Sequence, residues 1–571
     1  MKIKILLFAF PIFFVVLFAA TLIFEELRPH PRVNQLIISS SGDASFLNPI
    51  LAQDVTSSDI NSLIFNGLIK YNRNLDGFVG DLAESWKLNI GPEPDITFFL
   101  RRGVLWQDGK EFTANDVKFT YHKIMDPKTN TVRRSSYEWV KKAEALDPYT
   151  FRVTYKQPFS PGLESWSIGT IPEHLLRDVD INAAPFNRHP IGTGPFRFVE
   201  WLSDEKIVLE ANPRYFEGKP LLDGIIYRII PEAALNETEV LAREIDYSGI
   251  YPFEYRRMNQ LPFLEAYSQP GLGYTYIGYN LNNPLFQDRR VRRALTYAIN
   301  REAVVQYVLY GLGMVATGPF PNNMWYGNPH VKPIPFDPEK ARQLLAEAGW
   351  HPNRNGILEK EGRPFRFTLI TNNGNDTRRD VAVLIQRQLR DIGIDVNLEF
   401  YEWSVFITDY IDARHFDACL LGWSLSVDPD AYEIWHSSQI EKGFNFISYR
   451  NPEVDRLLVE GRRVYDLEKR KEIYWRIHQL IAEDQPYTFL FVPLNLSVLR
   501  KRFFLLERGQ LRPIRLEKAG LLYDITKWYV PKKREGDEIR NPVSEQQIGR
   551  LRDKTKFIRS KRQAFFTQME Q

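Results

Sequence analysis

The chain has 571 residues, 44% of them hydrophobic and 25% charged, an ordinary globular composition in a chain too long for one compact core. Its net charge of +3 is unevenly placed, because residues 532–571 hold 11 basic and 6 acidic side chains while residues 1–531 hold 63 and 65. The nearly neutral body excludes the basic surface that nucleic-acid binding requires. The single cysteine, Cys419, excludes an internal disulfide and a cysteine-cluster metal site, and its apolar neighbours predict a buried thiol.

The N-terminus carries a predicted membrane segment. Lys2 and Lys4 precede an uncharged run over residues 5–24, which as a helix would rise about 30 Å, enough to cross a bilayer. Positive charge on the leading side holds that end in the cytoplasm, so the body is expected outside it. Residues 19–21 form a poor cleavage site, and no cysteine follows to carry a lipid. We favour an uncleaved anchor over a cleaved signal peptide.

Strands and helices alternate after this segment. Residues 35–41 are β-branched and apolar and stop at Gly42, which predicts a strand that enters a loop. Residues 96–100 and 150–155 are also strand-like, and residues 115–124 begin with a capping residue, which favours a helix.

Three helices with clear ends are predicted in the middle of the chain. Asp288 caps the first, and Asn300 caps the second, which Gly311 closes. Pro338 opens the third at the first helical position, and Gly349 ends it.

Residues 365–423 contain the most informative pattern. Apolar residues alternate over 365–369 and over 394–400, and one apolar helix face lies between the two runs. Strand, helix and strand with short joints form a βαβ unit, so the two strands should be parallel. A further strand over 416–421 runs directly into Gly422. This alternation predicts an α/β protein.

The loop after this last strand is the best ligand contact from pattern alone, because ligands bind beyond the carboxyl ends of strands in open α/β sheets. Residues 423–432 combine an aromatic face, hydroxyl groups and two carboxylates around a turn fixed by Pro429. In a purely structural interpretation, Trp423 packs beneath the loop and Asp428 makes a local turn with Pro429. Both interpretations stay open.

The last forty residues, 532–571, lose this patterning and are strongly charged. Such a tail contacts anionic lipid or a partner in some proteins and is simply solvated in others. We treat it as an appendage.

Several short segments carry a family likeness when they are taken together and in order. They are Gly192-Thr193-Gly194-Pro195-Phe196, Asn212-Pro213-Arg214-Tyr215-Phe216-Glu217-Gly218-Lys219-Pro220, Tyr279-Asn280-Leu281, Asp288-Arg289-Arg290-Val291-Arg292-Arg293-Ala294-Leu295, Ala298-Ile299-Asn300-Arg301, Leu344-Leu345-Ala346-Glu347-Ala348-Gly349-Trp350, Ile392-Gly393-Ile394, Gly422-Trp423 and Asp428-Pro429. With these segments the chain resembles, over about residues 35–505, the bacterial solute-binding proteins of the peptide/nickel importer class, the oligopeptide- and dipeptide-binding family.

This resemblance implies a two-lobed α/β fold of the periplasmic-binding-protein type (type II), with an additional third domain. The ligand, a peptide or peptide-like solute, would be enclosed between the lobes, and ABC permease and ATPase subunits in the membrane would supply transport. The implied boundaries are 1–34 for the anchor or signal peptide and linker, 35–53, 190–278 and 495–531 for the first lobe, 54–189 for its inserted domain, 279–494 for the second lobe, and 532–571 for the appendage.

The resemblance also implies two ligand contacts. Gln53, Asp54 and Val55 follow Leu47-Asn48-Pro49, at the place where peptide-binding members contact the ligand backbone. The loop that contains Trp423, Ser424, Ser426 and Asp428 would face the ligand from the other side of the cleft.

This chain departs from the family at one position of that loop. Peptide binders place an aspartate three residues after the tryptophan to pair with the ligand's α-amino group, whereas this chain has Ser426. A hydroxyl group does not neutralise a buried ammonium group. We therefore expect no salt bridge to the ligand from Ser426, and Asp428 or Asp430 would replace it only in a rearranged loop. Blocked peptides, sugars and chelated nickel stay open as ligands.

Two other function classes compete with this prediction. The sequence contains no G-x-x-x-x-G-K-[ST], H-E-x-x-H or G-x-S-x-G motif, and its nine histidines lack metal-ligand spacing. Asp428 and Asp430 share one loop, whereas glycoside hydrolysis needs carboxylates on opposite sides of a sugar. We therefore predict no catalytic residues, no metal ligands and no cofactor. A membrane-anchored sensor or scaffold with the same fold is the second alternative.

Overall fold

The computed structural model describes residues 34–531, except 92 and 442. The predicted anchor and the charged appendage lie outside these residues. Within them, no helix is both long enough and apolar enough to cross a membrane. The fold is mixed α/β, as the sequence predicted.

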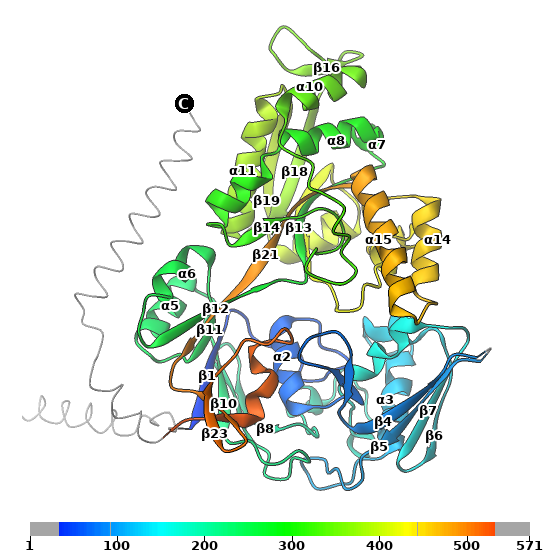
Figure 1. The fold of residues 1–571 in the computed structure, drawn as a ribbon, viewed down its shortest axis with the longest axis vertical. Helices are drawn as coiled ribbons and strands as arrows, with labels where there is room; N and C mark the ends of the chain where they lie inside the picture. Colours follow the sequence, from blue (N-terminus) through cyan, green and yellow to red (C-terminus); the bar gives the residue numbers. More distant parts are fainter. Residues whose placement is uncertain (1–33, 92, 442, 532–571) are drawn as a thin grey trace, which may run out of the picture.

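One twelve-stranded sheet extends through the molecule (Figure 1). Strand β21 (Tyr487–Arg500) joins its two halves, because β13 and β14 pair with one end of it and β11 and β12 pair with the other. The other strands are β19 (Asp395–Tyr401), β18 (Arg366–Asn372), β20 (Ala418–Trp423), β13 (Tyr274–Tyr279), β14 (Gly313–Val315), β11 (Tyr247–Gly249), β12 (Leu264–Pro270), β1 (Gln35–Ser40), β10 (Gly224–Ile229), β9 (Lys206–Ala211) and β8 (Phe196–Leu202).

Smaller sheets and the helices complete the fold. The small-sheet strands are β2 (Ile69–Tyr71), β3 (Phe78–Gly80), β4 (Ala83–Asn89), β5 (Asp95–Leu100), β6 (Val140–Asp147), β7 (Thr150–Tyr155), β15 (His351–Pro352), β16 (Leu358–Lys360), β17 (Arg363–Pro364), β22 (Phe504–Glu507), β23 (Gln510–Pro513) and β24 (Trp528–Tyr529). The α-helices are α2 (Val55–Ile64), α3 (Ala114–Met125), α4 (Glu173–Leu176), α5 (Ala233–Leu241), α6 (Pro252–Met258), α7 (Pro284–Gln287), α8 (Arg289–Ala298), α9 (Arg301–Ala303), α10 (Pro338–Glu347), α11 (Asp376–Arg390), α12 (Trp403–Val405), α13 (Tyr432–Trp435), α14 (Pro452–Gly461) and α15 (Leu467–Asp484).

Buried apolar side chains form clusters on either side of the middle of β21. Two clusters drawn from residues 274–492 make up what we call the upper body. Two further clusters, drawn from residues 36–264 and 498–530, make up the lower body. Figure 1 shows β21 as the orange strand that passes from one body into the other.

The predicted βαβ unit is confirmed in the upper body. Strands β18 and β19 are parallel along their whole length, and α11 connects them. Strand β20 pairs in parallel with β18 and reaches Trp423, two residues beyond its predicted end. Cys419 is buried in β20, as expected, and this burial raises the pKa of its thiol to about 12.

The predicted helix starts are confirmed at Asp288, Asn300 and Pro338, the last capped by Asp337. The second of these helices is short, since α9 gives way to a π-helical turn over Val304–Val308. Helix α3 begins one residue before the predicted range. Its cap is Thr113, whose side chain bonds the first turn while Asp116 accepts the Thr113 N–H at 2.9 Å.

The Gly192-Thr193-Gly194 segment permits a close approach to the end of α2. A Cβ atom at Gly192 would lie 1.8 Å from the carbonyl oxygen of Ile64, and one at Gly194 would lie 2.5 Å from the Ile64 carbonyl carbon. Only glycine fits at such distances, and the Gly194 N–H donates to the same Ile64 oxygen at 2.7 Å. These glycines therefore seat α2 against β8, beside the boundary between the bodies.

A buried ion-pair network fixes the lower end of β21. The Asp246 side chain is 1% exposed and accepts hydrogen bonds from Arg500 at 3.1 Å and from Arg502 at 2.7 and 2.8 Å. The same carboxylate accepts the backbone N–H of Ile37 in β1 at 3.0 Å. Asp246 directly precedes β11, so its carboxylate connects β11 to β1 and to the last residue of β21.

Replacing Asp246 by Ala should lower the free energy of unfolding by about 3–5 kcal/mol, because two largely buried guanidinium groups lose their anion. Glu265→Ala is the matched control, since it removes an exposed pair with Lys501 on the neighbouring β12 and should cost less than about 1 kcal/mol. Urea unfolding of both variants provides the measurement. Equal losses would show that the buried network has no special role.

Candidate functional site

A cavity of about 1270 Å³ lies between the lower and upper bodies. From the lower body it is lined by α2, by residues 65–71, and by the short helices η1 (Arg133–Tyr137) and η3 (Glu164–Ser167). The upper body contributes the loop that follows β20. Sites for drug-sized ligands usually occupy about 300–1,000 Å³, so this cavity suits a larger or extended ligand.

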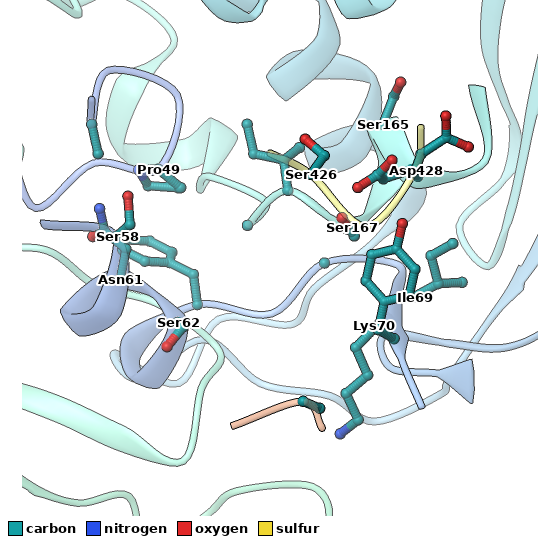
Figure 2. Close-up of a pocket in the computed structure, with 18 of the residues that line it drawn as sticks. Pro49, Ser58, Asn61, Ser62, Ile69, Lys70, Ser165, Ser167, Ser426 and Asp428 are labelled. Carbon is teal, nitrogen blue, oxygen red and sulfur yellow. The ribbon is translucent and has the colours of Figure 1, made fainter. Parts of the chain in front are cut away.

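Hydroxyl and carboxylate groups dominate the polar lining. Figure 2 shows serines of both bodies, Ser165 and Ser167 from the lower and Ser426 from the upper, around one space. Acidic side chains outnumber basic ones there by seven to three. The serines are Ser58, Ser62, Ser135, Ser136, Ser165, Ser167, Ser424 and Ser426, the acids are Asp59, Asp81, Glu164, Glu217, Asp428, Asp430 and Glu433, and the bases are Lys70, Arg133 and Arg462.

All three basic groups have partners within the protein, and the partner of Arg462 lies in the loop after β20. Lys70 lies 3.4 Å from both Asp81 and Glu217, so its charge is already balanced. Arg133 donates to the carbonyl oxygen of Ala52 at 3.3 Å, which ties η1 to the loop before α2. These bonds position the cavity wall.

Trp423 is the last residue of β20 and lies between buried aromatic side chains and the cavity. Its indole ring lies nearly parallel to the ring of Tyr276, with centroids 6.3 Å apart and planes 14° apart, and its Nε1–H donates to Tyr487 at 3.4 Å. The half-buried ring also lines the cavity. It therefore packs against Tyr276 and Tyr487 and forms part of the cavity wall.

Arginines from α15 and the end of α14 hold the loop after β20. The Asp428 carboxylate accepts two hydrogen bonds from Arg470, at 2.9 and 3.0 Å, and one from the N–H of Asp430 at 3.0 Å. Arg462 lies 3.0 Å from the Asp430 carboxylate. Each aspartate of the loop has its own arginine, and a two-pronged arginine–carboxylate pair is geometrically specific.

Glu164 approaches this loop from the lower body. Burial and the nearby carboxylates of Asp428 and Asp430 raise the pKa of Glu164 to about 8, against the opposing effects of a hydrogen bond with Tyr71 and the charge of Arg470. Burial likewise raises the pKa of Asp430 to about 6, although Arg462 opposes that shift. Within residues 34–531, no lysine or arginine forms an ion pair with Glu164. Burial and the two neighbouring carboxylates therefore favour the protonated form of Glu164.

The two bodies also touch directly beside the cavity. The Ser160 N–H donates to the carbonyl oxygen of Arg462 at 2.7 Å, and the Phe159 N–H donates to the Tyr465 hydroxyl at 3.1 Å. The Arg462 guanidinium lies over the Phe159 ring, 5.1 Å from its centroid. Arg462 thus contacts both the opposite body and the loop aspartate Asp430.

Comparison with known protein families shows to which family this chain belongs. The family model described as "Bacterial extracellular solute-binding proteins, family 5 Middle" matches residues 77–444. The chain belongs to this family. The resemblance predicted from the short segments is confirmed, and the family consists of extracellular solute-binding proteins, not enzymes.

Named relatives cover most of this solute-binding protein. The oligopeptide-binding protein AppA of Bacillus subtilis is 39% identical over 511 residues, which make up 87% of this chain and 92% of AppA. The dipeptide-binding protein of Escherichia coli is 27% identical over 482 residues, or 80% of this chain and 88% of that protein.

Solved structures of the family have the same fold. The structure of AppA from B. subtilis in complex with a nonapeptide has a TM-score of 0.76 and 37% identity, and it covers 87% of this chain and 99% of AppA. NikZ from Campylobacter jejuni in complex with Ni(L-His) has a TM-score of 0.76 and 28% identity, with the same coverage.

Five of the seven residues predicted to contact the ligand line the cavity of this solute-binding protein: Gln53, Trp423, Ser424, Ser426 and Asp428. Ser424 and Ser426 are exposed in the loop, with the Ser426 carbonyl oxygen accepting from Tyr326 at 3.3 Å.

The other two predicted residues, Asp54 and Val55, are not part of the cavity lining. Asp54 is the N-cap of α2 and accepts from the Ser57 N–H at 2.7 Å and from the hydroxyls of Ser57 and Ser45. The Val55 side chain is 76% exposed. The structure therefore gives Asp54 a capping role at the edge of the cavity.

Sequence reasoning missed the cavity residues contributed by residues 54–189. Lys70, Tyr71, Arg133 and Glu164 all line the cavity, yet none belongs to a recognisable segment. Nothing in the sequence around Glu164 distinguishes it from an ordinary acidic residue in a helical turn. Only its contact with a loop about 260 residues away reveals it.

Proposed function

We propose that this protein is the solute-capturing component of an ABC-type importer and that it binds peptides in the cavity between its two bodies. The observation that most supports this proposal is the cavity, which has a volume of about 1270 Å³ and is rich in hydroxyl groups. The chain that forms it is 39% identical to an oligopeptide-binding protein. A related structure holds a nonapeptide, and an extended peptide of that length suits a cavity of this size. Serine hydroxyls and half-buried aromatic rings can bond and pack a ligand backbone whatever its side chains.

The proposal includes the predicted two-lobed architecture, with the first lobe at 35–53, 190–278 and 495–531, the second at 279–494 and an inserted domain at 54–189. Separate hydrophobic clusters on either side of β21 support the lobes. The four-stranded sheet β4-β5-β7-β6, built entirely within residues 54–189, supports the inserted domain.

The proposed partners are ABC permease and ATPase subunits, inferred from the family. The proposed location is the outer face of a bacterial inner membrane, with the N-terminal segment 5–24 as an anchor. Support for the anchor comes from the sequence alone: twenty uncharged residues, a poor cleavage site and no cysteine directly after the segment.

Binding should depend more on Trp423 than on Ser426. Trp423→Ala removes an aromatic face from the cavity wall and should weaken peptide binding about tenfold, whereas Trp423→Phe should lose less. Ser426→Ala removes an exposed neutral hydroxyl and should change the affinity less than about threefold. Isothermal titration calorimetry of residues 34–531 with a nonapeptide measures these effects.

The reverse order of effects would contradict these roles. Tight binding of a sugar or of chelated nickel, with no binding of peptides, would favour the alternative ligands. Absence of any transportable ligand would favour a sensor or scaffold.

The lobes should close on the ligand by bending at the segments that cross between them, of which β21 is one. The radius of gyration from small-angle X-ray scattering should therefore fall when a saturating peptide is added. A radius unchanged by a ligand whose binding is verified in the same sample would exclude such closure.

The mature protein should retain residues 5–24. N-terminal sequencing of protein extracted from membranes should begin ahead of this segment. A sequence that begins near Leu22 or later would establish cleavage and exclude the anchor.

A further inference from the structure

A ligand ammonium group that enters this cavity needs an anion, because an unpaired buried charge is very costly. Ser426 supplies only a neutral hydroxyl at the position where the family resemblance implies an aspartate. The two carboxylates of the same loop are each held by an arginine, Asp428 by Arg470 and Asp430 by Arg462. The loop therefore offers no uncommitted negative charge.

Glu164 is the third carboxyl group at this place, and it comes from the opposite body. It lines the cavity, and the groups that face it are Asp428 and Asp430 on the loop after β20, Arg470 on α15, the Tyr71 hydroxyl on β2 and the Tyr326 hydroxyl. In the described chain its hydrogen-bond partner is thus a neutral tyrosine and not a cation. Three carboxyl groups and two arginines leave a formal charge of −1 once Glu164 ionises, and one monovalent cation would balance it.

We propose that Glu164 determines ligand specificity by pairing with a cationic ammonium group of the bound peptide. This inference rests on the proposed function, because it concerns the same cavity. The ammonium group is either the peptide's amino terminus or a basic side chain near it, and both have the same chemistry. Glu164 thereby takes, from the opposite wall, the role that Ser426 cannot perform.

The pairing predicts a definite dependence on pH. Without ligand, burial and the neighbouring carboxylates raise the pKa of Glu164 to about 8, so the group is protonated at pH 6. A bound ammonium stabilises the carboxylate, so binding at pH 6 must release the proton and is weakened by that requirement. Affinity should rise from pH 6 to pH 8. Above pH 8 it should fall for an α-amino group, whose pKa is about 8, but not for a lysine side chain.

The test uses three forms of one nonapeptide of alanine and serine: with a free amino terminus, acetylated, and acetylated with lysine at the first position. Wild type should bind both cationic forms about 10- to 100-fold more tightly than the acetylated neutral form. Glu164→Gln should reduce this preference to less than about threefold. Glu164→Asp, which keeps the charge at a shorter reach, should retain part of it.

Glu138→Gln is the matched control, because Glu138 is an exposed acid of the same body that does not line the cavity. It should leave the preference unchanged.

Proton release gives a second readout. Titrations at pH 6.5 in two buffers of different ionisation enthalpy should show about one proton released per cationic peptide by wild type and none by Glu164→Gln.

The possible outcomes separate this inference from the proposed function. If all three peptides bind wild type equally, or if Glu164→Gln keeps the preference, peptide binding stands and the role of Glu164 is overturned. If only the free amino terminus is preferred, the ammonium is the peptide's α-amino group, and if only lysine is preferred, it is the side chain. Failure of every peptide to bind wild type would overturn the proposed function and this inference together.

Thermal unfolding at pH 8 checks that Glu164→Gln folds. A neutral amide beside Asp428 and Asp430 removes like-charge repulsion, so the variant should be at least as stable as wild type at this pH. The raised pKa of Glu164 means that its stabilising effect is complete below pH 4.5 and is lost as the pH rises through 8.

Discussion

Strand β21 makes backbone hydrogen bonds in both bodies, and the relation between the two depends on this shared strand. Its first residues pair with β13 and β14 of the upper body, and its last residues pair with β11 and β12 of the lower body. Hydrogen-bond register along one strand is discrete, so the bodies cannot slide past each other along β21 without breaking the ladder. The Asp246 network then secures its lower end against β1. The proposed bending at β21 would instead change the width of the cavity and preserve its two walls.

The chemistry of the cavity follows from which elements supply charge. Helices α14 and α15 deliver Arg462 and Arg470 to the loop after β20, and these arginines fix both aspartates. The lower body supplies Glu164, which lies beside this loop across the boundary between the two bodies. Because Arg462 also contacts Phe159 and Ser160 across the boundary, the loop and the contact between the bodies share one residue.

Sequence reasoning succeeded where the cause of a structure lies within a few residues. Helix caps at Asp288 and Asn300, the βαβ unit and the buried Cys419 depend on local periodicity and capping, and the structure contains all of them. Asp54, which the resemblance implied as a ligand contact, lies outside the cavity lining, and its side-chain oxygens cap α2. Glu164 shows the limit of pattern itself. Its environment comes from Asp428, Asp430 and Arg470, and their proximity is a property of the folded chain alone.

The serine-rich wall has a consequence for how a ligand is held. A hydroxyl group donates or accepts a hydrogen bond after rotation about a single C–O bond, so it has no fixed polarity to match. A peptide that moves one residue along such a wall exchanges amide N–H for C=O groups and still finds partners. Of the eight serines of the lining, Ser58, Ser62 and Ser165 donate to backbone carbonyl oxygens and would meet a ligand as acceptors. The other five hydroxyls would donate or accept after rotation, so a bound peptide would find partners in several registers of similar energy. On such a surface the order of side chains along a peptide matters little, and a single charged contact is enough to select one register from the rest.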